Sequence, residues 1–342
     1  MKKIAVIPGD GIGKEVVAEG CKLMDALGVS YQIFNYDADY WLQHKQGISD
    51  QQLEELRTFD AIYFGALGDP RLPKMEHGKD ILLKMRFDLD LFANVRPIQL
   101  LDVNHSPLRP EIANNIDIVI VRENTEDLYR GLGGRFKAGQ IDEVAIDERI
   151  HTRAGVRRIV EYAFEYAVKN NRQKVTLVDK HNAIPNGGQL WLSVFDEISK
   201  GYPNIVGEYQ HVDVACAIMV AQPERFDVVV TSNLFGDILS DLGAGLVGGL
   251  GLLSSANVNG NGIGLFEPVH GSAPDIVGME RANPLAAFAT LAMLFKHVGL
   301  LDECEQLLYA IKQSISQDIT TPDLDGKHTT SQVGEYIISR ML

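Results

Sequence analysis

The sequence contains few cysteines and no cysteine pair at metal-binding spacing. Only three occur, Cys21, Cys216 and Cys304, and none belongs to a CxxC motif. A disulfide framework or a zinc site would need closely paired cysteines, so neither is indicated. This usage fits a reducing compartment, and we expect a cytoplasmic protein.

Long apolar runs and an excess of positive charge are also missing. No run approaches the roughly 20 residues that cross a bilayer. The apolar run in the N-terminal stretch MKKIAVIPGDG is too short for a signal peptide. Lys and Arg number 32 against 46 Asp and Glu, for a formal net charge of −14. This balance argues against nucleic acid or a membrane as partner, and an anionic substrate would need a local cluster of arginines.

The sequence has the composition and patterning of a globular α/β protein. Hydrophobic residues make up 45% and charged residues 23% of the 342 residues, which is long enough for two domains. Apolar strands alternate with amphipathic helices, as in the strand Lys3–Ile7 and the helix that follows from about Lys14. The turn between them, Pro8–Gly13, has GxGxG instead of GxGxxG spacing, so it is a weak signal for dinucleotide binding.

A pair of carboxylates follows the apolar run Phe226–Val230, which is typical of a buried strand. Asp237 and Asp241 are four residues apart. A helix that begins near Gly236 would place both on one face. Two carboxylates so close suit a hard divalent cation, Mg²⁺ or Mn²⁺. The alternative is an Asp at the helix N-cap with a second, solvated Asp near the positive end of the helix dipole.

Three arginines are predicted to reach one edge of the sheet. Arg86 lies in a predicted helix, while Arg96 and Arg122 lie at the predicted ends of two strands. Ligands of open α/β sheets bind at the carboxyl ends of strands, and each guanidinium can hold a carboxylate bidentately. The set suits a di- or tricarboxylate. For Arg86 alone, a surface ion pair with Asp90 is the alternative.

Other segments leave alternatives open. Lys180 follows a buried strand and is either a tuned general base or a solvated lysine. Asp213 opens an apolar helix, either as its N-cap or as an inward carboxylate. We expect a loop or hairpin over Arg130–Gln140, a strand over Asp142–Ile150 and a polar loop over Leu265–Asp275.

Together these motifs resemble the β-decarboxylating dehydrogenases, the family of isopropylmalate, isocitrate, homoisocitrate and D-malate/tartrate dehydrogenases. The resemblance runs essentially from end to end. It rests on PGDGIG (8–13), R-x9-R-P (86–97), RENTEDLY (122–129), DKHN (179–182), HVD (211–213), QPERFDVVVTSNLFGDILSD (222–241) and EPVHGSAPDI (267–276). It implies an isopropylmalate dehydrogenase-like fold, with two α/β domains around a large mixed sheet, that is not a true Rossmann fold.

The resemblance also implies a domain division and a dimer. Residues 1–98 plus 250–342 would form a discontinuous cofactor-side domain, and residues 99–249 a domain for substrate, metal and dimerisation. A clasp between subunits would lie near residues 130–147. The protein would be a homodimer with shared active sites, because Lys180 and Asp213 would reach into the site of the partner subunit.

The family's functional residues carry over onto matching positions. By resemblance, Arg86, Arg96 and Arg122 hold the carboxylates of a small dicarboxylate substrate. Tyr129 and Lys180 serve as acid and base, Asp213, Asp237 and Asp241 bind Mg²⁺ or Mn²⁺, and Asp213 also contacts the substrate. The residues implied for NAD are Ile12, Glu267, His270, Gly271, Ser272, Ala273, Asp275, Ile276 and Asn283. NAD⁺ is expected over NADP⁺, because Asp275 would accept hydrogen bonds from the adenosine ribose and repel a 2′-phosphate.

The substrate implied is a (2R)-malate-type 2-hydroxy acid that is oxidised and decarboxylated. Leu82 and Leu83 match the apolar positions by which isopropylmalate dehydrogenases bind the branched alkyl group. We therefore expect 3-isopropylmalate, converted to 4-methyl-2-oxopentanoate in leucine biosynthesis. RENTED, LGGRF and the LLK-x-R helix are closer to the D-malate/tartrate branch, so D-malate, tartrate and other 3-substituted malates remain alternatives. Asp80, Leu82 and Leu83 stand where isocitrate enzymes place Ser and Asn, which disfavours isocitrate.

Overall fold

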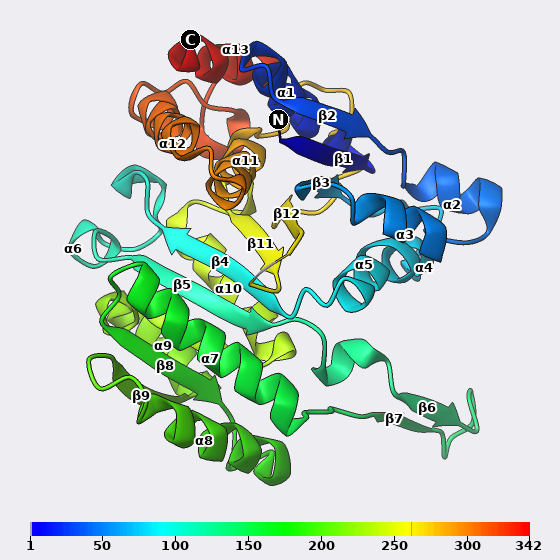
Figure 1. Cartoon of the computed structure of the whole chain (residues 1–342), viewed down its shortest axis with the longest axis vertical. Helices are drawn as coiled ribbons and strands as arrows, with labels where there is room; N and C mark the ends of the chain where they lie inside the picture. Colours follow the sequence, from blue (N-terminus) through cyan, green and yellow to red (C-terminus); the bar gives the residue numbers. More distant parts are fainter. Residues whose placement is uncertain (1, 261) are drawn as a thin grey trace.

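A ten-stranded sheet runs through the molecule in the computed structural model, which describes residues 2–260 and 262–342 (Figure 1). Its strands lie in the order β2-β1-β3-β12-β11-β4-β5-β10-β8-β9. They are β1 (Lys3–Gly9), β2 (Ser30–Ile33), β3 (Ala61–Ala66), β4 (Ala93–Gln99), β5 (Asp117–Glu123), β8 (Lys174–Asp179), β9 (Val206–His211), β10 (Val228–Thr231), β11 (Ser254–Val258) and β12 (Gly264–Pro268). β11 and β4 run antiparallel to their neighbours, and the other pairs are parallel. The predicted α/β class with a large mixed sheet is confirmed.

Helices cover both faces of this sheet. They are α1 (Ile12–Ala26), α2 (Ala38–His44), α3 (Asp50–Leu56), α4 (Glu76–Gly78), α5 (Lys84–Asp88), α6 (Pro110–Ala113), α7 (Arg153–Lys169), α8 (Pro185–Ser199), α9 (Val212–Ala221), α10 (Asn233–Val247), α11 (Leu285–Val298), α12 (Leu301–Ser316) and α13 (Thr330–Met341). A π-helical segment, Lys79–Leu83, joins α4 to α5. Among the helices described, none is long and apolar enough to cross a membrane.

Strand periodicity divides the core between the two faces. Val119 and Val121 of β5 belong to the apolar cluster that includes α7, whereas Ile118 and Ile120 belong to the cluster that includes α10. Successive side chains of a strand point to opposite faces of the sheet, so α7 and α10 cover opposite faces. The active-site residues described below lie on the α10 face.

A two-stranded antiparallel hairpin projects from the body of the molecule (Figure 1). Its strands are β6 (Gly133–Phe136) and β7 (Val144–Asp147). The hairpin prediction for this region is confirmed, although both strands are shorter than the segments predicted. Their residues are all exposed, so this hairpin has no core of its own.

Two predictions for the centre of the sheet are wrong. The segment expected to be a loop from Leu265 begins instead with β12, every residue of which is buried. Its partner β11, with the sequence SSANV, was not predicted because small and polar residues do not resemble a strand. Arg96 lies inside β4 and not at a strand end. Each of these elements is stabilised by neighbours distant in sequence, which local patterns do not reveal.

Candidate active site

The two carboxylates on α10 lie one helical turn apart. The helix begins at Asn233 instead of near Gly236, and the side chain of its N-cap residue, Ser232, makes no capping hydrogen bond. Asp237 is therefore inside the helix, and the alternative that placed it at the N-cap is wrong. Asp237 and Asp241 share a face, as their spacing predicts.

The N-terminus of α10 is capped by a distant residue. Asp127 follows β5, is fully buried, and accepts a hydrogen bond from the backbone N–H of Leu234 at 3.0 Å. Arg149 binds both oxygens of this carboxylate, at 2.5 and 2.9 Å. Burial by itself raises the pKa of Asp127, but these hydrogen bonds outweigh it and hold the pKa below its usual value. A buried carboxylate thus stabilises the helix that carries the acidic pair.

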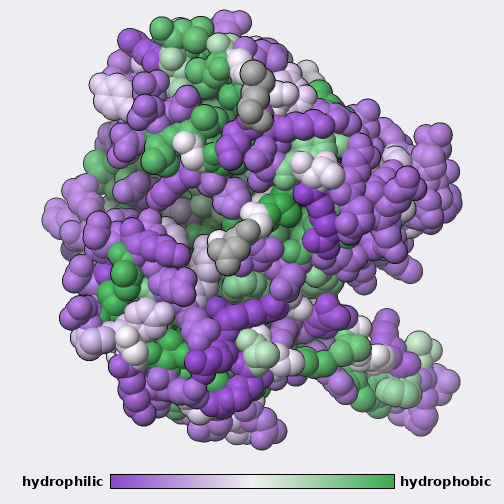
Figure 2. Space-filling view, viewed as in Figure 1, coloured by the Kyte–Doolittle hydropathy of each residue, from purple (hydrophilic) through white to green (hydrophobic). Residues whose placement is uncertain are grey.

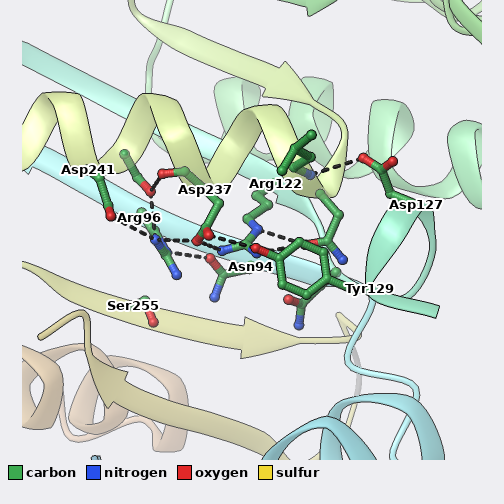
Figure 3. A network of polar contacts seen from close by, with 12 residues as sticks. Asn94, Arg96, Arg122, Asp127, Tyr129, Asp237, Asp241 and Ser255 are labelled. Atoms are coloured by element: carbon green, nitrogen blue, oxygen red, sulfur yellow. Dashed lines mark hydrogen bonds and ion pairs between the residues drawn. The ribbon is translucent and has the colours of Figure 1, made fainter. Parts of the chain in front are cut away.

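Two of the predicted arginines reach the acidic pair (Figure 3). Arg122 donates a hydrogen bond to Asp237. Arg96 Nη1 lies 3.5 Å from Asp237 Oδ1 and 3.8 Å from Asp241 Oδ1. The Tyr129 hydroxyl donates to Asp237 Oδ2 at 2.6 Å. Five predicted site residues are therefore brought together, from β4, β5, the 3-10 helix Asp127–Arg130 and α10.

Arg86 is buried, and its partner is not Asp90. Its Nη2 donates to Glu267 Oε1 at 2.7 Å, whereas Asp90 pairs with Arg158 at 2.8 Å. The surface ion pair considered for Arg86 is therefore wrong. Among the described residues, no acceptor reaches its buried Nε. Because an unpaired buried N–H is costly, a carboxylate ligand at this position would restore the missing hydrogen bond.

Buried asparagines hold the guanidinium groups in place. Arg96 Nε donates to Asn94 Oδ1 at 2.8 Å, Asn94 Nδ2 donates to Asn257 Oδ1 at 2.8 Å, and Asn257 Nδ2 donates to Glu267 Oε1 at 2.8 Å. This chain links Arg96 to the partner of Arg86. Asn94 and Asn257 are not among the predicted site residues, although Asn within a strand is an unfavourable residue that signals a polar contact.

Asn233 holds the remaining arginine. Its Oδ1 accepts from Arg122 Nε at 2.9 Å and from Nη2 at 2.7 Å. An amide oxygen of this kind orients a guanidinium without neutralising it, so the charge of Arg122 remains to pair with Asp237 or with an anionic ligand.

Burial and charge set the ionisation of the site. Burial raises the pKa of Asp241, and the charge of Asp237 raises it further. Burial also raises the pKa of Asp237, but the Arg122 charge, the Tyr129 hydrogen bond and the Arg96 charge outweigh it and lower the pKa. Burial, together with the charge of Arg122, lowers the pKa of Arg96 to about 10. Burial and the hydrogen bond to Asp237 raise the pKa of Tyr129, so its hydroxyl keeps its proton. A divalent cation would relieve the repulsion between the two carboxylates, so their oxygens fit Mg²⁺ or Mn²⁺.

Lys180 and Asp213 form a separate, more exposed pair. Lys180 Nζ donates to Asp213 Oδ1 at 2.5 Å, and the two side chains are 25% and 61% exposed. This hydrogen bond lowers the pKa of Asp213. His211 occupies the N-cap position of α9, so the N-cap alternative for Asp213 is wrong. Among residues 2–260 and 262–342, no three acidic, His or Cys side chains are close enough to share a metal ion. One chain therefore does not bring Asp213 to the pair on α10.

The residues expected to contact the C3 substituent lie on the π-helical segment. Leu82 and Leu83 are half-buried, whereas Ile81 and Met85 are fully buried in the core, against which Leu82 packs with part of its surface. π-Helical turns are frequent at functional sites. The Asp80 carboxylate accepts a hydrogen bond from Trp41 Nε1 at 2.8 Å. Asp80 therefore holds the π-helical segment against α2.

The segment predicted to bind NAD packs against the glycine-rich turn after β1. Ser272 O accepts from the backbone N–H of Ile12 at 2.9 Å. Gly11 has φ of 55°, and a Cβ there would lie 2.1 Å from Ser272 O, so only glycine fits. The PGDGIG turn is therefore shaped to receive Ser272 of the segment predicted to bind NAD.

The other predicted NAD residues surround this contact. Asn283 is buried and donates to Asp323 at 2.9 Å, and Glu267 lies at the end of β12 beside Arg86. His270 Nε2 is buried without a partner among the described residues, and burial lowers the pKa of this histidine. The Asp275 carboxylate is exposed and free of described partners. The rest of the set, which is partly or fully exposed, consists of Gly271, Ala273 and Ile276.

Comparison with known proteins gives consistent matches across the chain. The family model described as isocitrate/isopropylmalate dehydrogenase matches residues 3–337. A 3-isopropylmalate dehydrogenase of Streptomyces griseus subsp. griseus is 43% identical, over 99% of this chain and 98% of its own length. One of Thermobifida fusca is 41% identical, over 99% and 97%. The crystal structure of isocitrate dehydrogenase from Methylococcus capsulatus has a TM-score of 0.90 at 39% identity, over 100% of this chain and 99% of that one.

Proposed function

We propose, since the chain belongs to the isocitrate/isopropylmalate dehydrogenase family, that this decarboxylating dehydrogenase oxidises 3-isopropylmalate with NAD⁺ to 4-methyl-2-oxopentanoate and CO₂, in leucine biosynthesis. The observation that carries the proposal is a group of three arginines: Arg96 and Arg122 contact the acidic pair, and Arg86 is linked to Arg96 through Glu267, Asn257 and Asn94. All three guanidinium groups are buried. Buried arginines suit a substrate that brings two carboxylates, because each can form charge-assisted hydrogen bonds.

A divalent metal would be held by Asp237 and Asp241 together with Asp213 of the partner subunit. Bound Mg²⁺ or Mn²⁺ would supply a Lewis acid to the C2 hydroxyl, and NAD⁺ would supply the hydride acceptor. Lys180 of the partner subunit would accept the hydroxyl proton, directly or through water. Tyr129, which keeps its proton because burial raises its pKa, would donate to C3 after CO₂ leaves.

Leu82 and Leu83 favour an alkyl group at C3. Both are half-buried apolar side chains one turn before Arg86, so part of their surface is open to a ligand. Burying an isopropyl group there would contribute roughly 2 kcal/mol, or about thirtyfold in kcat/KM. D-malate lacks this group and isocitrate carries a charged carboxymethyl group in its place.

We also propose a homodimer with shared active sites. The exposed Lys180–Asp213 pair and the absence of a third described acid beside α10 support it. The hairpin of residues 130–147 would be the clasp, and exposed apolar side chains on it and on α9 and α10 support this role: Leu132, Phe136, Ile141, Val144, Ile146, Val214, Val220 and Ile238.

The domain division 1–98 plus 250–342 against 99–249 remains part of the proposal. The sheet order supports it, because β2-β1-β3-β12-β11-β4 come from the first part and β5-β10-β8-β9 from the second. We propose a cytoplasmic location, which the free state of Cys21, Cys216 and Cys304 supports.

The deciding experiment is a kcat/KM panel, followed by the absorbance of reduced nicotinamide. It compares 3-isopropylmalate, D-malate, tartrate, isocitrate and homoisocitrate, with NAD⁺ and Mg²⁺ present. We expect 3-isopropylmalate to exceed D-malate by about thirtyfold, from the burial of the alkyl group. A tenfold preference for D-malate would refute the alkyl pocket, and Leu82→Ala should lower only the 3-isopropylmalate value.

A further inference from the structure

A groove of about 550 Å³ opens on the face of the sheet opposite α10. Figure 2 shows it as the hollow near the middle of that face, between α11 and α12 on one side and α7 on the other. We call it the back groove. Its floor consists of β4, β11 and β12. Its size falls within the roughly 300–1,000 Å³ of small-molecule sites.

The floor of the back groove is apolar because of strand periodicity. The floor residues are Val95, Pro97, Ala256, Val258 and Phe266. The residues between them, Asn94, Arg96, Asn257 and Glu267, form the buried polar network on the other face. The back groove is thus separated from the active site by the thickness of one sheet.

The rim of the back groove is basic. Lys169, Lys296 and Lys312 line it, and none of its lining residues is Asp or Glu. Lys169 pairs with Glu165, which lies outside the lining, at 3.4 Å. This contrasts with the chain as a whole, whose net charge is −14. Lys296 Nζ donates to Asn170 at 3.1 Å, across from α11 to the end of α7. Within the described part of the chain, Lys312 has neither hydrogen bond nor ion pair. An anion near Lys296 and Lys312 would therefore meet positive charge that no carboxylate compensates within the described part of the chain.

We propose that the back groove binds an amphipathic carboxylate, a monoanion with a hydrocarbon tail. The tail lies along Val95, Ala256 and Phe266, and the carboxylate lies at Lys296 and Lys312. Apolar floor and basic rim together select this class: a neutral hydrocarbon would leave the lysines unused, and a small polar anion would leave the floor uncovered.

Isothermal titration calorimetry of the intact protein with octanoate tests the proposal by measuring the affinity. Ala289, half-buried on α11, lines the back groove, so Ala289→Phe should fill it and weaken octanoate binding at least tenfold. Leu308 is 43% exposed at the rim, so Leu308→Glu should fold normally and repel the carboxylate, with a similar loss. Lys312→Gln should weaken binding about threefold. The matched control is Lys200→Gln, an exposed lysine after α8, which should change nothing.

Octanoate could instead bind the active-site arginines, and the variants separate the two sites. None of the substituted residues contributes to the arginine cluster, so binding there would be unchanged in Ala289→Phe and in Leu308→Glu. Unchanged affinity in both variants, or no binding by the unsubstituted protein, would overturn the proposal. Octylamine, which has the same tail and a positive head, should bind at least tenfold more weakly than octanoate, and equal affinity would also overturn it.

Discussion

On one face of β4 and β11, Asn94, Arg96 and Asn257 form a buried polar network, and on the other face Val95 and Ala256 line an apolar groove. The two regions are built from alternate residues of the same strands. The difference shows that the period of two in a strand allows a charged site and an apolar surface to lie back to back. Substitutions on the polar face should therefore cost far more than those on the groove face.

The largest effect is expected at the acidic pair. Asp237→Asn removes one oxygen ligand and one charge from the proposed metal site, so kcat should fall by roughly a thousandfold. Steady-state kinetics at several Mg²⁺ concentrations would measure it, with circular dichroism to verify folding. Asp302→Asn, which makes the same charge change on the exposed first turn of α12, is the control and should retain full activity. Full activity of the unsubstituted protein in EDTA would refute the metal-dependent mechanism.

Asp127→Asn should have the next largest effect, through the cap of α10. Loss of its charge leaves the partly buried Arg149 without its ion-pair partner, and should cost about 3 kcal/mol in the free energy of unfolding at neutral pH. Asn tolerates the positive φ of 68° at this position, so the backbone is kept.

The pKa of Asp127 predicts how the stability lost in Asp127→Asn depends on pH. The folded pKa of Asp127 is lowered, so its contribution is complete above the unfolded value of 3.8 and is lost as pH falls through the folded pKa. The difference between Asp127→Asn and the unsubstituted protein in urea unfolding should therefore be constant above about pH 5 and shrink below about pH 4. A constant difference down to the lowest accessible pH would contradict it.

Asn257→Ala compares the two faces directly. It leaves Asn94 and Glu267 short of a partner, so we expect a loss of about 2 kcal/mol in stability. KM for the substrate should rise several-fold while kcat changes little, because Arg86 and Arg96 lose their orientation. Ser254→Ala, on the groove face of the same strand, should cost under about 0.5 kcal/mol and leave KM unchanged. Equal costs at both positions would remove the distinction between the faces.

The smallest effect is expected on cofactor preference, from substitution of the exposed Asp275. Asp275 should give a preference for NAD⁺ over NADP⁺ of about a hundredfold, which needs only about 2.7 kcal/mol. Asp275→Asn keeps the side-chain size but removes the charge that repels a 2′-phosphate, and should reduce the ratio of the two kcat/KM values about tenfold. A ratio near one in the unsubstituted protein would show that Asp275 does not select the cofactor.

Features that depend on near neighbours in the chain could be predicted from the sequence. The spacing of Asp237 and Asp241 places them on one helix face wherever the helix begins, because four residues make about one turn. Two further features depend likewise on residues close in the sequence. They are the hairpin near residues 130–147 and the predicted end of β5 at Arg122. The glycine-rich turn PGDGIG (8–13) is also visible in the sequence. The structure explains its Gly11, because there is no room for a side chain at that position.

By itself, the sequence determined the α/β class, the family resemblance and the identity of the charged residues, because these depend on residue types and short spacings. Only the tertiary structure decided which partners those residues have. Glu267 reaches Arg86 across 181 positions of the chain, and Asp127 caps a helix that begins far beyond it. β11 and β12 are strands because their neighbours in the sheet complete their hydrogen bonds, not because their residues favour it. Contacts between distant segments arise from packing of the whole sheet, which no local pattern encodes.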